Sequence, residues 1–148
     1  MLSLVATNIL YPDMILKSAI SSTLSLTSSL ISSIGYLKSL TKHDTELYNL
    51  LNLSDILNDV FIIKSFIEEK QTKNSSQTVS MCIANLSETL SELEKHVNSI
   101  IKKIKNHKNL WFNRFRSYDI AFEQSQIPIL NEQMKHRFEL LIKISSSI

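Results

Sequence analysis

Glycine is almost absent from this chain: Gly35 is the only one among 148 residues, and Pro12 and Pro128 are the only prolines. Tight turns, hairpins and phosphate-binding loops depend on glycine because it adopts positive φ without steric cost. A chain with so few turn residues is built from long elements joined by few loops. The sequence therefore predicts an all-α fold and argues against all-β folds and nucleotide-binding α/β folds.

Composition favours one intracellular domain covering residues 1–148. A hydrophobic content of 43% supplies a continuous core, and the length suits a single domain. The net charge of +2 is too small to indicate nucleic acid or a membrane by itself. Cys82 is the only cysteine, so no intramolecular disulfide forms, which favours a reducing compartment. The apolar start lacks the basic region of a signal peptide, and we expect a cytoplasmic protein.

Four amphipathic helices are predicted from hydrophobic periodicity and capping residues. Their predicted ranges are 14–40, 45–70, 76–105 and 128–145. Suitable N-cap residues precede the first three helices, namely Asp13, Asp44, and Ser75 or Ser76. Together the four helices predict an up-down-up-down bundle.

Three local features refine this prediction. Ser54 and Asp55 lie inside the second helix and allow a kink there. Pro128 is a favoured first-turn residue, so the last helix is expected to open near it. A short extra helical segment is expected over residues 109–118, before the last helix.

The third helix carries the clearest pattern in the chain. Eight apolar residues follow each other in alternating steps of four and three: Val79, Ile83, Leu86, Leu90, Leu93, Val97, Ile100 and Ile104. This is an unbroken heptad seam. It predicts burial inside the bundle, and the alternative is a coiled coil between subunits.

The other three helices also carry apolar faces, which need a surface to cover them. In the first helix we expect the buried residues to be Leu16, Ile20, Leu24, Ile31, Ile34 and Leu37, with Leu26 and Leu30 beside them. In the second they are Leu47, Leu50, Leu51, Leu57, Val60, Phe61, Ile63 and Ile67. In the last they are Leu130, Met134, Phe138, Leu141 and Ile142.

No pattern of a catalytic, metal or cofactor site is present. One glycine cannot build a phosphate-binding loop, and one cysteine cannot anchor a zinc site. Two Glu–His pairs have i,i+4 spacing, Glu92 with His96 and Glu132 with His136. We interpret them as charges on a helix surface, with a metal or acid–base pair as the alternative. We therefore expect a protein that is not an enzyme and that has no catalytic residues, no metal and no cofactor.

The first helix is free of charge between Lys17 and Lys38 and rich in serine. Twenty uncharged residues are long enough to span a bilayer, but eight of them are serines, which lowers the hydropathy. Small residues at i,i+4 spacing also allow close helix packing. The expectation is a closely packed helix of the bundle, with membrane entry as the alternative.

A basic and aromatic segment follows the heptad seam. Its candidate contact residues for a partner or lipid are Lys102, Lys103, Lys105, Lys108, Trp111, Phe112, Arg114 and Arg116. Cations interleaved with aromatic rings suit anionic lipid headgroups, single-stranded nucleic acid or an acidic protein groove. The structural alternative is that the lysines complement a helix C-terminus and the aromatic rings close the end of the bundle.

The order of these parts resembles HeLo-type bundles. These include fungal HeLo domains, the N-terminal bundle of the mixed-lineage-kinase-like pseudokinase, and the coiled-coil domains of some plant immune receptors. The stretch KKIKNHKNLWFNRFRSYDIAFE, residues 102–123, is similar to the basic, Trp-containing junction of the plant members. The resemblance implies a bundle that oligomerises and engages membranes through its first helix and its basic residues.

Three functional hypotheses follow. The first is a non-enzymatic interaction or assembly module that binds a protein partner or a second copy of itself. The second is a membrane-engaging, oligomerising bundle of the HeLo type, associated peripherally with an anionic membrane surface. The third is a small nucleic-acid-binding protein, which the weak net charge disfavours. No small-molecule substrate is inferred.

Overall fold

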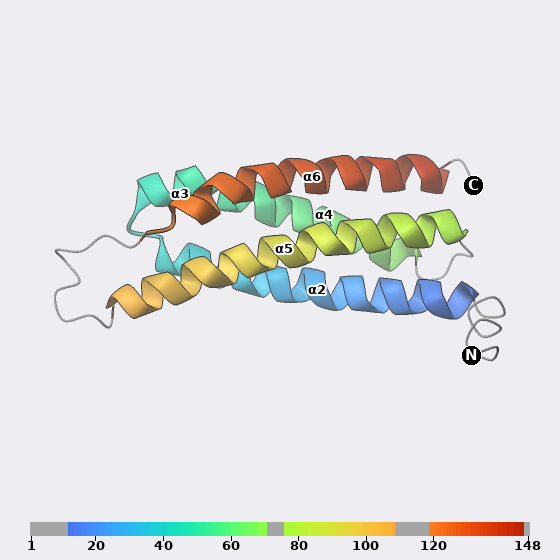
Figure 1. Cartoon of the computed structure of the whole chain (residues 1–148), viewed down its shortest axis with the longest axis horizontal. Coiled ribbons are helices and arrows are strands. Elements are labelled where there is room, and N and C mark those ends of the chain that lie inside the picture. Colours follow the sequence, from blue (N-terminus) through green and yellow to red (C-terminus); the bar gives the residue numbers. More distant parts are fainter. Residues whose placement is uncertain (1–11, 71–75, 109–118, 147–148) are drawn as a thin grey trace.

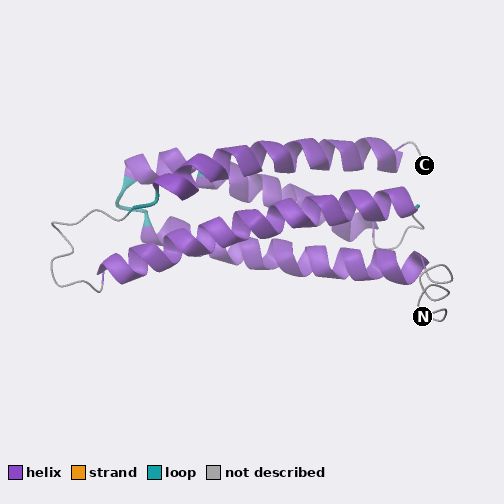
Figure 2. Ribbon diagram, in the orientation of Figure 1, coloured by secondary structure: helices purple, strands orange, loops and turns teal. Residues whose placement is uncertain are grey.

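Residues 12–70, 76–108 and 119–146 are described by the computed structural model, and every regular element in them is a helix. The helices are α2 (Pro12–Leu40), α3 (Thr45–Leu51), α4 (Leu53–Lys70), α5 (Gln77–Lys108) and α6 (Ala121–Ser146) (Figures 1 and 2). Since α3 and α4 together occupy the place of one long helix, the predicted all-α, four-helix fold is confirmed. The short helical segment expected over 109–118 lies outside the described residues.

Successive long helices alternate in direction along the bundle (Figure 1). They do not pack in chain order, however. α5 packs against α2 and α6, and α2 also packs against α4, which lies diagonally across from α5. Because the directions alternate, the neighbouring helices α2 and α5 run parallel and finish at the same end. We call this the junction end, because α3 and α6 begin there.

The starts of α3 and α5 are capped by residues that the sequence predicts. The Asp44 carboxylate accepts a hydrogen bond of 3.0 Å from the backbone N–H of Leu47. The Ser76 hydroxyl accepts one of 3.3 Å from the backbone N–H of Val79. By contrast, α2 begins at Pro12, so Asp13 lies inside its first turn and does not precede the helix.

The second predicted helix breaks at Asn52, two residues before the expected kink. Asn52 has a left-handed backbone with φ of 54°, which asparagine tolerates better than most residues. The Asn52 N–H donates a hydrogen bond to the carbonyl of Asn49, which ends α3. The Asn52 carbonyl accepts a hydrogen bond from the Ile56 N–H, which begins α4. A single residue, Asn52, therefore separates α3 from α4, with no loop between them.

The α5 seam forms the centre of the core. All eight of its apolar side chains are buried, and α2 and α6 of the same chain pack against α5. The predicted buried seam is therefore confirmed. Because its own chain covers the seam, it is not available for a coiled coil between subunits.

The expected start of the last helix is wrong. α6 begins at Ala121, seven residues before Pro128, and the proline lies inside the helix. A proline there removes one backbone N–H. Pro128 lies on the exposed side of α6, where water can replace that missing donor. The Asp119 carboxylate accepts a 3.1 Å hydrogen bond from the Ala121 N–H and helps to start the helix instead.

Three residues that were expected to be buried are exposed: Leu50 at 58%, Phe61 at 47% and Ile142 at 39%. The break at Asn52 explains the first two, because the apolar face of α3 does not continue in phase along α4. α4 buries Leu53, Ile56, Val60, Ile63 and Ile67 instead. On α6 the buried set shifts toward its N-terminus and includes Glu123, Ile127 and Asn131.

Candidate functional site

The predicted basic and aromatic segment begins in the last turns of α5, at the junction end. Lys102, Lys103 and Lys105 lie on that helix, and Lys108 is its last residue. The remaining candidate residues, Trp111, Phe112, Arg114 and Arg116, lie outside the described residues. The structure therefore describes the surroundings of Lys102, Lys103 and Lys105 only.

Lys103 is part of a polar cluster that joins α5 to α6. The buried carboxylate of Glu123 accepts hydrogen bonds of 2.7 Å from both the Lys103 ammonium and the Ser99 hydroxyl. Burial by itself raises the pKa of Glu123. The hydrogen bonds from Lys103, Ser99 and the backbone, together with the charge of Lys103, outweigh it and lower that pKa below its ordinary value. Lys103 thus holds two helices together.

The other two described lysines differ in their surroundings. The Lys105 ammonium lies 4.9 Å from the centre of the Tyr36 ring on α2, a cation–π contact. Lys102 is exposed. Of these three lysines, Lys102 and Lys105 are the ones whose charges remain at the surface for a ligand, since Lys103 neutralises a buried acid.

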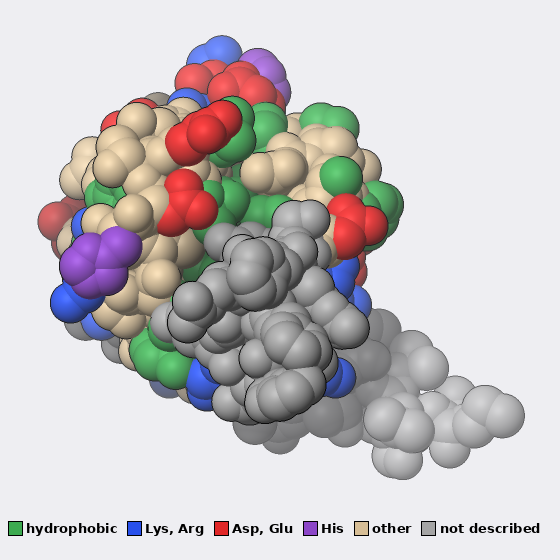
Figure 3. Space-filling model, turned by 90° about the vertical axis from the view of Figure 1, so that its left-hand side faces the viewer, with side chains coloured by type: hydrophobic (Ala, Val, Ile, Leu, Met, Phe, Trp, Pro, Cys, Tyr) green, Lys and Arg blue, Asp and Glu red, His purple; other side chains and the backbone are tan. Residues whose placement is uncertain are grey.

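The junction end as a whole carries both signs of charge. A shallow groove of about 420 Å³ between α3 and the start of α6 includes Asp44, Glu46 and Asp119 in its lining. Figure 3 looks onto this end and shows acidic as well as basic side chains around it. The described surface there is therefore not a uniform cationic patch.

Each glutamate of the two Glu–His pairs has a lysine as an ion-pair partner. Glu92 makes a 2.9 Å ion pair with Lys95, and Glu132 lies 3.7 Å from the ammonium of Lys135. His96 packs its ring against Phe122, with centroids 5.5 Å apart. Within residues 12–70, 76–108 and 119–146, no three His, Cys, Asp or Glu side chains gather as metal ligands would.

The serines of α2 lie on its exposed side and along its contact with α5. Ser22, Ser25 and Ser29 line a shallow groove of about 550 Å³ between the two helices, and Ser29 donates a hydrogen bond to Glu94. Thr23 and Thr27, which the sequence interpretation did not single out, are fully buried. Among the described helices, none is both long enough and apolar enough to cross a bilayer.

One surface was not anticipated from the sequence: an apolar row on the outside of α6. Phe122 is 63% exposed, Ile129 is 61% exposed and Leu140 is 50% exposed. At 3.6 residues per turn, positions 7 and 18 residues apart lie within about 20° of one line along a helix. Gln126 and Gln133 lie within about 40° of that line on one side, and the exposed His136 lies equally near it on the other. The strip therefore contains no Asp, Glu, Lys or Arg. We call Phe122, Gln126, Ile129, Gln133 and Leu140 the α6 outer row.

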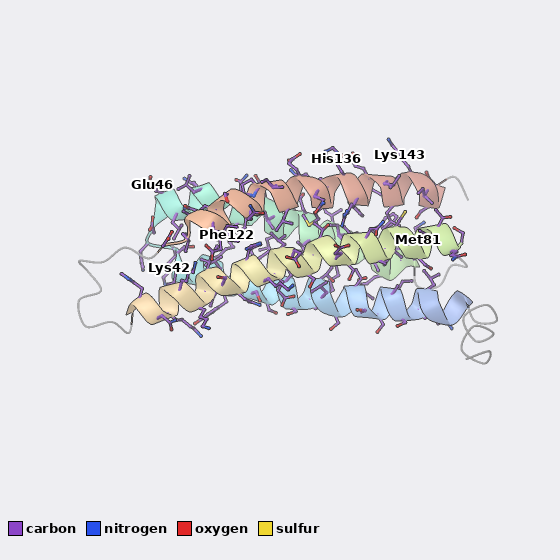
Figure 4. The ribbon with its side chains drawn as sticks, in the orientation of Figure 1. Lys42, Glu46, Met81, Phe122, His136 and Lys143 are labelled. Carbon is purple, nitrogen blue, oxygen red and sulfur yellow. The ribbon has the colours of Figure 1, made fainter. Side chains whose placement is uncertain are left out.

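The α6 outer row is held rigidly by the contact between α5 and α6. Arg137 donates hydrogen bonds of 2.6 Å to the Asn85 carbonyl and 2.7 Å to the Thr89 hydroxyl. Thr89 in turn donates to Gln133, at 3.3 Å. Phe122 contacts the ring of His96 on α5 at the other end of the row. Figure 4 shows Phe122 at the junction end of α6 and Lys143 near the opposite end.

The contact between α4 and α6 is looser and more polar. Phe66 meets Phe138 edge to face, with centroids 5.4 Å apart, and Lys135 lies 4.0 Å from Asp59. One carboxylate oxygen of Asp59 and the amide oxygen of Asn131 are buried without a hydrogen-bond partner. Burial raises the pKa of Asp59, with Asp55 and Glu132 adding to the rise and Lys135 opposing it.

Comparison with known proteins gives no family. No protein-family model matches the chain, and no solved structure matches it. Over 82 residues the chain is 33% identical to an uncharacterized protein of Acanthamoeba polyphaga mimivirus. That match covers 53% of this chain and 38% of the viral protein, so the chain spans well under half of that relative.

Proposed function

We propose that the protein is a non-enzymatic helical bundle that acts as an interaction or assembly module, with the α6 outer row as its contact surface. The observation that carries this proposal is the exposure of Phe122, Ile129 and Leu140 along one line. Burying an apolar side chain of this size contributes roughly 1.5–3 kcal/mol. Three of them on one rigid helix supply a contact that a partner can cover.

The polar outer side of α2 supports this choice by contrast. Its exposed positions include Ser18, Ser21, Ser28 and Ser32, which give a partner little apolar area. The α5 seam is occupied within the chain. The outer row of α6 combines three exposed apolar side chains along one line with a backbone that is bonded to α5, whereas α4 exposes only the adjacent pair Phe61 and Ile62.

Site-specific photo-crosslinking in cells that contain the protein tests the proposal. A photoreactive phenylalanine analogue replaces Ile129 in one variant and Ser32, an exposed residue of α2, in a matched control. We expect a discrete crosslinked product from position 129 and none from position 32. The absence of a product from position 129, or equal products from both positions, would contradict the proposal.

A second candidate function is binding to an anionic membrane surface. It is favoured by the parallel course of α2 and α5, which brings Lys38 and Lys42 to the same end of the bundle as Lys102 and Lys105. Each exposed cation near such a surface contributes on the order of 1 kcal/mol. The acidic side chains of Asp44 and Glu46 at the same end oppose this attraction.

Flotation with anionic liposomes tests this second candidate. If it is correct, changing Lys102 and Lys105 to Gln weakens binding chiefly at low salt, because salt screens exposed charges. Lys103 is left unchanged, since it pairs with Glu123. The change Trp111→Ala is expected to weaken binding at all salt concentrations. A wild-type protein that stays unbound to these liposomes excludes this function.

A further inference from the structure

We infer that the partner of the α6 outer row is a second copy of this chain, bound antiparallel to form a two-fold dimer. This inference rests on the proposed function and names its partner. It is carried by the distribution of charge along α6 and by the position of the apolar side chains within the row.

Exposed charge differs in sign between the two ends of the α6 region. In the first half the exposed acids are Asp119, just before α6, and Glu132, since Glu123 is buried and paired with Lys103. In the second half Arg137 is bonded to α5 and Lys135 lies near Asp59 and Glu132, so Lys143 is the exposed base close to the end of the helix. A helix with an exposed acid at its start and an exposed base near its end is complementary to its own reverse.

Antiparallel pairing of two copies uses this complementarity. It places Asp119 of each copy near Lys143 of the other, and it opposes the two helix dipoles. Parallel pairing would instead bring Asp119 to Asp119 and Lys143 to Lys143. These exposed charges therefore favour the antiparallel arrangement.

The apolar side chains fit the same arrangement. The midpoint between Phe122 and Leu140 is Asn131. A two-fold axis near that residue sets Phe122 of each copy against the second copy's Leu140, and Ile129 against the second copy's Gln133. The contact is the same surface on both partners, as a closed two-fold dimer requires.

The size of the row predicts a weak dimer. Phe122 and Leu140 are 18 positions apart, or about 27 Å along the helix axis. A strip of that length and one helix wide covers far less than the roughly 800 Å² per partner of a standard interface. The neighbouring face of α5, which includes the 60% exposed Met81, extends the contact area. We expect association at micromolar concentrations or above.

Sedimentation equilibrium of the full chain tests the inference. The mass is expected to rise with concentration from 17.0 kDa toward twice that value. Ile129→Glu and Leu140→Glu are each expected to weaken association at least tenfold. Phe61→Glu, which changes an equally large exposed residue on α4, is the matched control and is expected to leave association unchanged.

Zero-length crosslinking between carboxylates and lysines tests the direction of pairing. Lys143 and Asp119 of one chain lie at opposite ends of α6, roughly 36 Å apart, so a bond between them forms only between two copies. We expect that bond in the crosslinked dimer and its loss in Leu140→Glu. A dimer in which Lys143 links instead to Glu132 or Glu139 of the other copy would overturn the antiparallel arrangement.

The remaining outcomes separate this inference from the proposed function. A chain that stays monomeric at all concentrations, or a dimer that Phe61→Glu breaks and Ile129→Glu does not, overturns the inference. If such a monomer still gives a photo-crosslinked product with a different protein from position 129, the proposed interaction function stands and only its partner changes. If position 129 gives no product, both fail.

Discussion

The ammonium of Lys103 donates a 2.7 Å hydrogen bond to the carboxylate of Glu123, which joins the end of α5 to the first turn of α6. Glu123 is almost fully buried, so its charge depends on this partner. Removing Lys103 while keeping the acid leaves a buried carboxylate with only Ser99 as side-chain donor. We expect Lys103→Met to lower the free energy of unfolding by about 1–3 kcal/mol, measured by urea denaturation.

Lys102→Met is the matched control, because Lys102 is the exposed residue directly before Lys103 on the same helix. It is expected to change the free energy of unfolding by about 0.5 kcal/mol or less. Adding Glu123→Met to Lys103→Met is expected to recover much of the loss, since no buried charge then remains. Equal effects of the two lysine changes would show that the Lys103–Glu123 pair does not stabilise the fold.

The Lys103–Glu123 pair also predicts that the stability of the fold depends on pH. The pKa of Glu123 is lower in the folded chain than in the unfolded one, so its contribution is present above the ordinary glutamate pKa of about 4.3. That contribution is lost as the pH falls through the folded-state value. We expect wild type to exceed Glu123→Gln in stability at pH 7, with the gap narrowing toward pH 3. A gap that does not depend on pH would contradict this assignment.

Asp59 predicts the opposite dependence of stability on pH. Its pKa is raised in the folded chain, first by burial, so the folded state favours the protonated acid. The associated stability is present below the ordinary aspartate pKa and is lost as the pH rises through the folded value. Asp59→Asn is therefore expected to raise the melting temperature at pH 7 by up to a few degrees, about 1 kcal/mol or less. The difference between Asp59→Asn and wild type should disappear near pH 3. A melting temperature of Asp59→Asn below that of wild type at pH 7 would refute the assignment.

The α5 seam predicts a large loss for a single truncation. Leu90→Ala is expected to cost roughly 2–5 kcal/mol, because the side chain is fully buried. Leu50→Ala makes the same change at an exposed leucine of α3 and is expected to cost far less. Chemical denaturation monitored by circular dichroism measures both. A cost below about 0.5 kcal/mol at Leu90 would place the seam on the surface.

The sequence predicted the parts of this fold that depend on a regular pattern within one helix. The heptad seam from Val79 to Ile104 was correct residue by residue, because an uninterrupted helix preserves the phase of its apolar positions. The capping roles of Asp44 and Ser76 were also correct, since each involves a backbone group only three residues away.

The parts that were missed depend on phase changes and on contacts between helices. A left-handed Asn52 shifts the phase between α3 and α4, so Leu50 and Phe61 were placed on the wrong face. Pro128 suggested a helix start because proline suits a first turn, yet Asp119 starts α6 earlier. Lys103 was grouped with its exposed neighbours because its partner Glu123 is twenty residues away. The α6 outer row became visible only once the inner face of α6 was known.

The most direct test of self-association through the α6 outer row is methyl NMR of the unmodified, isoleucine-labelled protein over a range of concentrations. Ile129 lies in the outer row of α6, while Ile62 is a half-exposed isoleucine on α4. We predict that the Ile129 methyl resonance shifts progressively as concentration rises through the micromolar range, while the Ile62 resonance stays fixed. A concentration-dependent shift of Ile62 with Ile129 unchanged, or no shift of either, would contradict self-association through the α6 outer row.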